Sequence, residues 1–232
     1  MKKTILSLFA FALAASTFAP LTAGAKVGLN YTTWSIKYET DPQEKPDNPS
    51  GIGFHLGGYL QFDLSDQFAF RPELLFSVRG MKQSSTTTST TTVFGITTTT
   101  KSDYDDKGSY SYLEVPLLMA WKASDMLAIH FGPGIGLLMG AKYTSDISTS
   151  TTVGGSTTSS SSTVEVSGSD AKEGMRGSEI GLCVGGAYET EGGLNFGLRY
   201  WRGLTTVNDD TEFVKVNTNL IQVSVGYSFL KP

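Results

Sequence analysis

Eight ionisable residues lie within apolar segments of the 232-residue chain. They comprise three carboxylates, three guanidinium groups and two imidazoles: Glu73, Glu114, Glu179, Arg71, Arg79, Arg199, His55 and His130. Opposite charges can be buried when they pair, whereas removal of one partner strands the other at high cost. The set therefore predicts either a structural plug of ion pairs or a path for protons or small solutes. Which carboxylate meets which guanidinium is left open.

The residue types present give little support for a catalytic site or a metal site. A hydrolase would need a nucleophile, a base and an orienting acid that converge. His55 and His130 instead fall in the middle of their segments, and the chain contains neither Gly-x-Ser-x-Gly nor His-Glu-x-x-His. With two histidines and one cysteine, Cys183, it supplies neither a zinc-finger ligand set nor an intramolecular disulfide. We expect no enzyme activity, no metal and no other cofactor.

Charge and composition narrow the class of partner. Charged residues make up 17% of the chain, below the roughly 25% of an ordinary soluble domain. The formal net charge is −4. Nucleic-acid binding requires a basic stripe, so we expect no nucleic-acid partner.

The N-terminal segment has the three parts of a secretory signal peptide. Lys2 and Lys3 precede an apolar run over 5–15, and Ala23-Gly24-Ala25 gives a small-residue cleavage pattern. The run is shorter than the roughly 20 residues that span a bilayer. We predict a signal peptide over 1–25 and a folded domain over 26–232; a buried N-terminal helix is the alternative.

The elements that must position the ionisable residues are strands. Apolar residues recur at every second position, the period of a strand with two different faces. In 127–139, Leu127, Ile129 and Phe131 share one face, and His130 and Gly132 share the other. Eight segments follow this pattern: 26–37, 52–62, 68–78, 112–121, 127–139, 179–188, 194–202 and 221–229.

The composition of the two faces indicates which one meets lipid. One face is bulky and apolar; the other is small, with the ionisable residues. An interior filled by eight bulky faces would be overpacked, whereas small residues with a few charges suit a narrow barrel. Most segments are as long as the 9–11 residues that cross a membrane as a tilted strand. A soluble lipocalin-like barrel, with the bulky face inside, is the alternative.

The connections alternate between long and short. Long ones cover 38–50, 82–109, 143–175 and 204–214, and short ones cover 64–66, 123–125 and 190–192. This layout predicts an all-β fold: an eight-stranded antiparallel up-and-down transmembrane β-barrel with short periplasmic turns and long extracellular loops. Aromatic residues near the short turns predict an interfacial girdle, with ordinary core packing as the alternative: Phe62, Phe68, Phe70, Trp121, Tyr188, Tyr227 and Phe229.

Two of the long connections are rich in serine and threonine. They supply 13 of the 17 residues in 84–100 and 15 of the 20 in 144–163. Too few apolar residues are present to form a core, so we expect mobile loops or hairpin extensions of the strands. Val93-Phe94-Gly95-Ile96 would then form a hairpin tip. The hydroxyls predict contact with a surface partner, or else a solvated loop without a specific ligand.

Three phrases in the strands carry a family resemblance. They are RPELLFSVRG at 71–80, YLEVPLL at 112–118 and FGPGIG at 131–136. With them, the chain resembles the outer-membrane β-barrel domain family, also labelled porin family or PorT-like. The resemblance implies a location in the bacterial outer membrane, contact with its lipid, and insertion by the outer-membrane assembly machinery.

The function expected from these features is that of a non-enzymatic outer-membrane protein with a structural or surface-interaction role. A narrow channel or transport-associated barrel is the alternative, and a hydrolase at the rim is a third hypothesis. An extracellular ligand or surface partner fits the first role, but the sequence does not name one.

Overall fold

The computed structural model describes residues 20–39 and 48–230. Within them the chain forms nine strands and one short 3-10 helix: β1 (Leu21–Tyr38), β2 (Ser50–Asp63), β3 (Phe68–Val93), β4 (Ile96–Lys122), β5 (Leu127–Val153), β6 (Ser156–Ser167), η1 (Asp170–Lys172), β7 (Ser178–Glu189), β8 (Leu194–Gly203) and β9 (Val214–Leu230). In the described part of the chain, no helix combines the length and the apolar character needed to cross a membrane.

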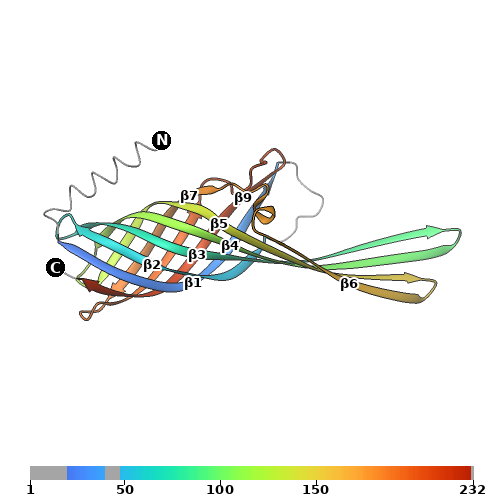
Figure 1. The fold of residues 1–232 in the computed structure, drawn as a ribbon, viewed down its shortest axis with the longest axis horizontal. Coiled ribbons are helices and arrows are strands. Elements are labelled where there is room, and N and C mark those ends of the chain that lie inside the picture. The colour runs from blue at the N-terminus through green and yellow to red at the C-terminus, as the bar shows by residue number, and fades with distance from the viewer. Residues whose placement is uncertain (1–19, 40–47, 231–232) are drawn as a thin grey trace.

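Eight of the strands close into a ring. The order is β1-β2-β3-β4-β5-β7-β8-β9, and β9 pairs again with β1, so that every neighbour is antiparallel. Strand β6 is the ninth and pairs with β5 outside the ring. The predicted eight-stranded up-and-down barrel is therefore confirmed (Figure 1). Closure matters because a ring has no open edge of unpaired backbone groups.

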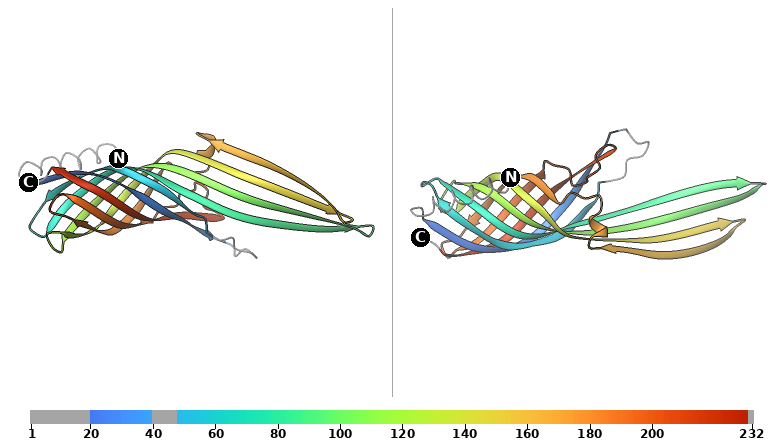
Figure 2. Two further views of the ribbon diagram at one scale, coloured as in Figure 1. Left: turned by 90° about the horizontal axis from the view of Figure 1, so that it is seen from below. Right: turned by 45° about the horizontal axis from the view of Figure 1, so that its top comes forward.

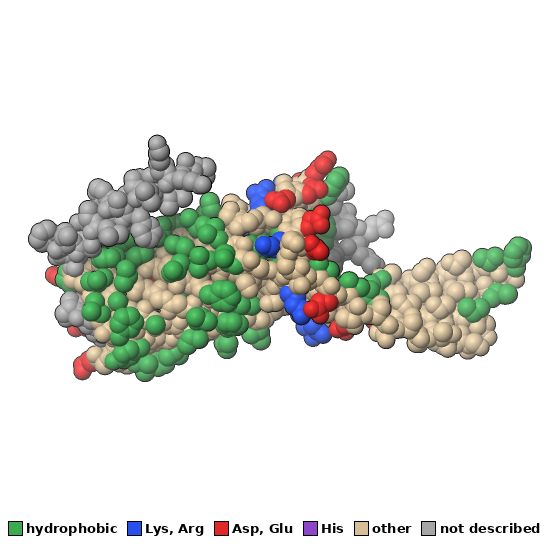
Figure 3. All heavy atoms as spheres, viewed as in Figure 1, with side chains coloured by type: hydrophobic (Ala, Val, Ile, Leu, Met, Phe, Trp, Pro, Cys, Tyr) green, Lys and Arg blue, Asp and Glu red, His purple; other side chains and the backbone are tan. Residues whose placement is uncertain are grey.

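The barrel carries its bulky apolar side chains on the outside. Val27, Leu198 and Val223 are more than half exposed, whereas Leu118 and Trp201 are fully buried. Figure 3 shows hydrophobic side chains spread over the barrel, with charged side chains gathered where the barrel gives way to the projecting part. The orientation of the two faces follows the alternation in the sequence.

Short turns lie together at one end of the barrel. Each is closed by backbone hydrogen bonds of 2.8 Å, from Leu64 to Phe68, Ala123 to Leu127 and Thr190 to Leu194. Figure 2 shows the C-terminal end of β9 at this same end. An even number of antiparallel strands requires this arrangement, since each pair of strands returns the chain to its starting side.

The serine- and threonine-rich segments are largely strand. We call their four-stranded part the projecting sheet: 82–93 of β3, 96–109 of β4, 142–153 of β5, and β6. Its two hairpin turns have positive φ angles, of 49° and 80° at Phe94 and Gly95 and of 56° and 90° at Gly154 and Gly155. Of the two expectations for 82–109 and 143–175, hairpin extension is the one observed, consistent with the β propensity of threonine.

Other segments differ from the expected boundaries. Strand β1 begins at Leu21, and its first five residues pair with β2 between Gly58 and Phe62. Of the predicted signal peptide, residues 1–19 lie outside the described part of the chain, as do residues 40–47 of the expected 38–50 loop. The 204–214 segment is irregular, with one bridge between Met175 and Asn208.

Candidate functional site

An upper cluster of charges fills the bore on the side of the projecting sheet. Arg79, from β3, contacts Glu114 of β4 at 3.0 Å between Nη2 and Oε1, and it also pairs with Glu179 of β7. Its Nη1 donates to Thr218 Oγ1 at 2.9 Å. All three charged side chains are at most 1% exposed. The guanidinium group of Arg79 therefore links four strands, β3, β4, β7 and β9.

Aromatic rings surround Arg79. The guanidinium carbon lies 4.1 Å from the ring centroid of Tyr112 and 5.3 Å from that of Trp201. Trp201 fits only because glycines face it: a Cβ atom at Gly134 or Gly181 would lie 2.4 Å from the indole. The glycines on the inner face therefore make room for the tryptophan that packs beside the ion pairs.

A lower cluster of charges surrounds Glu73, nearer the short turns. The Glu73 carboxylate lies 2.5 Å from Lys26 Nζ, 3.2 Å from Arg71 Nε and 2.7 Å from Arg199 Nη2. Arg199 also donates through Nη1 at 2.9 Å, so the pair is bidentate. Arg71 lies over the Tyr59 ring, 3.6 Å from its centroid.

The two histidines, His55 and His130, are both buried in the bore. Asn30 Oδ1 accepts a hydrogen bond from His55 Nδ1 at 2.7 Å, and Asn30 Nδ2 donates to Ser77 Oγ at 2.9 Å. His130 is 4% exposed, and its Nε2 has no hydrogen-bond partner among the described residues. The described chain likewise brings together no group of three His, Cys, Asp or Glu residues suited to a metal.

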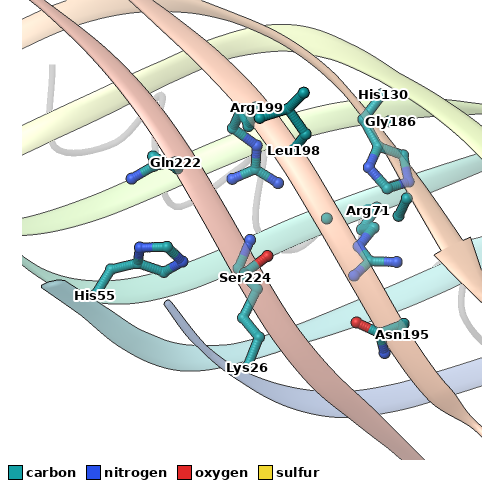
Figure 4. Close-up of a pocket in the computed structure, with 12 residues that line it drawn as sticks. Lys26, His55, Arg71, His130, Gly186, Asn195, Leu198, Arg199, Gln222 and Ser224 are labelled. Carbon is teal, nitrogen blue, oxygen red and sulfur yellow. The ribbon is translucent and has the colours of Figure 1, made fainter. Parts of the chain in front are cut away.

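A small cavity lies beside the lower cluster. Lys26, Arg71, Arg199 and His130 contribute to its lining. In Figure 4 the side chains of Lys26, Arg71 and Arg199 extend from different strands toward one space. The charged residues thus both brace the barrel and line a polar cavity.

An aromatic cluster fills the bore beyond Arg79. Trp34 and Tyr110 have ring centroids 4.8 Å apart and pack with Tyr112 and Val207. Trp34 Nε1 donates to Gly80 O at 3.0 Å, so its polar atom is satisfied. The packed rings occupy the bore on the side of Arg79 that faces the projecting sheet.

Hydroxyl pairs connect the strands of the projecting sheet. Examples are Thr92 with Thr97 at 3.1 Å and Thr152 with Thr157 at 2.8 Å. At its base, hydrogen bonding from the Thr163 hydroxyl and the neighbouring Lys107 lower the pKa of Asp146. Phe94 at the tip is fully exposed. The sheet thus offers hydroxyls along its length and an aromatic ring at its end.

The aromatic residues expected at the short turns lie on the outer face. Register pairs them across neighbouring strands, Phe62 with Phe70 and Phe68 with Trp121. Five of the seven are clearly exposed, whereas Phe62 and Phe70 are half-buried: the five are Phe68, Trp121, Tyr188, Tyr227 and Phe229. Their role as an interfacial girdle remains a prediction.

Lys26 is absent from the charged residues singled out in the sequence. The sequence instead predicts Lys26 as the first residue of the folded domain. The alternation of Val27, Leu29 and Tyr31 on the outer face gives the missing signal, because it turns Lys26 inward together with Asn30.

Comparison with known proteins gives a family and structural similarities. The family described as outer membrane protein beta-barrel domain matches residues 14–209. No match was found among curated proteins. Similar solved structures include Ail of Yersinia pestis, with 11% identity, coverage of 88% of this chain and 99% of the other, and a TM-score of 0.34. OprG of Pseudomonas aeruginosa has 12% identity, with coverage of 91% of this chain and 97% of the other and a TM-score of 0.36. CarO2 of Acinetobacter baumannii has 11% identity, with coverage of 91% of this chain and 99% of the other and a TM-score of 0.37.

Proposed function

The chain belongs to the outer membrane protein beta-barrel domain family, and on that premise we propose that it is a non-enzymatic surface-interaction protein of the bacterial outer membrane. The barrel is the anchor, and the projecting sheet is the part that contacts a partner. The observation that carries this proposal is the sheet itself, in which β3, β4 and β5 continue beyond the ring and β6 pairs with β5 (Figure 1).

The chemistry of the projecting sheet favours an uncharged partner. Between Ser84 and Thr100 there is no ionisable residue, and Ser156 to Val164 has none either. At the base, lysines are offset by acids, as in Lys107–Asp146 at 3.2 Å and Lys142–Glu165 at 2.7 Å. Hydroxyls hydrogen-bond to sugars or peptide groups without requiring a counter-charge. We therefore expect neutral glycans or protein surfaces, rather than polyanions, as partners.

The tip supports a contact role for a second reason. Phe94 combines full exposure with a φ of 49°, a region that bulky side chains rarely occupy. Val93 and Ile96 beside it are also more than half exposed. Strained backbone conformations tend to persist where function requires them. Burial of an exposed aromatic ring against a partner is energetically favourable.

Cell adhesion tests this proposal. In a trimmed variant, an Asn-Gly turn replaces 84–105 and another replaces 146–163; these cuts join the paired residues Gln83 with Asp106 and Ser145 with Val164. We expect cells carrying the full chain to be retained on surfaces coated with neutral glycans or proteins, and cells carrying the trimmed variant to be retained less. Equal retention, at matched surface amounts, would contradict the proposal.

A narrow channel is the second candidate, favoured by the polar cavity in the bore. Against it stand the packed rings of Trp34 and Tyr110 and the Arg79 cluster, which occupy the bore on one side of that cavity. Planar-bilayer recordings separate the two candidates. We expect no stable, discrete conductance steps, and reproducible steps would favour the channel.

A further inference from the structure

The lower cluster holds more positive than negative charge. Lys26, Arg71 and Arg199 all contact the same carboxylate, Glu73, which leaves an excess of two positive charges. The exposed fraction of these side chains is at most 8%. Buried charge of one sign requires compensation from nearby groups or from a bound ion.

Neighbouring carboxylates are already engaged elsewhere. Glu114 and Glu179 form their ion pairs with Arg79, in the upper cluster. Within the described chain, the four cations and three carboxylates of the two clusters still leave one positive charge in excess.

The cavity lies where that excess is concentrated. Its lining includes all three cations of the lower cluster, contributed by β1, β3 and β8. His130 reaches it from β5, and its Nε2 is a buried ring nitrogen without a partner in the described structure. Figure 4 shows the imidazole of His130 on the same side as Arg71. Three cationic side chains and the unpartnered ring nitrogen of His130 therefore border this space, together with Nε2 of His55 and Oε1 of Gln222, which are also unpartnered among the described residues.

We propose that this cavity binds one small monovalent anion, a halide or a short carboxylate. Lys26 Nζ and the guanidinium groups of Arg71 and Arg199 supply the charge, and His130 in its Nε2–H tautomer supplies a further donor. The narrow bore of an eight-stranded barrel restricts the occupant to a small ion. This site is independent of the surface role proposed for the projecting sheet.

Anion-dependent stability of the detergent-folded protein tests the site. The temperature at which the barrel loses its folded gel mobility is measured in chloride, bromide and acetate, each against gluconate at equal ionic strength. An anion that binds only the folded state stabilises it, and the stabilisation grows with the logarithm of one plus the ratio of the anion concentration to Kd. We expect the midpoint to be higher in the small anions than in gluconate.

Two lysine variants make the test specific. Lys26→Met removes a cation from the cavity and should abolish the difference between the small anions and gluconate. Lys122→Met is the matched control, because Lys122 pairs with Asp63 at 2.8 Å beside a short turn and does not line the cavity. That control should keep the difference. A difference that persists in Lys26→Met, or is absent from the wild type, overturns the proposal.

Crystals of the wild-type protein grown in bromide give a second readout that requires no variant to fold. We expect an anomalous peak within hydrogen-bond distance of Lys26 or Arg199. Water alone in the cavity, or an adventitious ion only on exposed lysines, would overturn the proposal. The acetate and halide measurements show which source of small anion the cavity prefers.

Discussion

Arg79 is the residue whose loss should harm the barrel most. It is fully buried between Glu114 and Glu179, so Arg79→Met leaves two carboxylates without their partner. Breaking a buried pair in this way costs about 3–5 kcal/mol. Denaturant unfolding in lipid vesicles should show a loss of that order.

A triple variant separates charge from packing in this cluster. Arg79→Met combined with Glu114→Gln and Glu179→Gln removes the stranded charges and should recover part of the lost stability. Lys101→Met is the control, because its pair with Asp103 is exposed and exposed pairs contribute little. If the single Arg79 variant were as stable as wild type, the ion pairs would not brace the barrel.

Phe94 offers a prediction about contact rather than stability. Glycine accepts the φ of 49° without strain, so Phe94→Gly should leave the hairpin folded while removing the exposed ring. We expect reduced retention of cells in the adhesion assay. Phe94→Tyr keeps both the ring and the backbone restriction at the tip and should behave as wild type. Undiminished retention of cells that carry Phe94→Gly would show that the ring makes no contact.

At the scale of elements, β1 raises a question about processing. Cleavage after Ala25 would remove Leu21 to Ala25, which pair with β2 on one side and in part with β9 on the other. Backbone groups left unpaired in lipid are costly, so we expect the mature chain to retain Leu21. The intact mass of protein purified from outer membranes measures this directly. A mass that begins at Lys26 would support the cleavage site predicted from sequence.

Strand elements were predictable because both periodicity and turn length point to the same ring. Alternation at 127–139 locates β5 within the barrel, and short turns such as 123–125 define the closed end. The ends of the strands were not predictable to the same degree. Serine and threonine tracts carry no apolar alternation, so only the β propensity of threonine hints that β3 continues to Val93.

The side chains in the bore were predictable as a set but not as pairs. Alternation turns Glu73 and Arg199 to one face, yet the two residues are 126 positions apart, and their strands β3 and β8 do not neighbour each other in the sheet. Their contact depends on the curvature of the closed barrel, which brings opposite walls together. The spacing of residues along the sequence does not show which side chains meet across the bore.

At the scale of the whole molecule, the apolar side chains on the outside of the barrel predict how stability depends on the membrane orientation. Val223 lies outside on β9 between Leu29 and Leu198. An arginine on the lipid face costs about 2–4 kcal/mol near the bilayer centre, so Val223→Arg should lower stability in vesicles by that order. Val164→Arg, on the exposed strand β6, is the control and should have little effect. Equal stability of the two variants would contradict the membrane orientation.

The long arms have a consequence for how the molecule can vary. Beyond Lys82 the arms of the β3–β4 hairpin pair with each other in one unbroken register, and each residue adds about 3.4 Å to its height. Insertion or removal of residues two at a time in both arms preserves which face each hydroxyl occupies. The length of the projecting sheet can therefore differ between related strains while the barrel in the lipid stays unchanged.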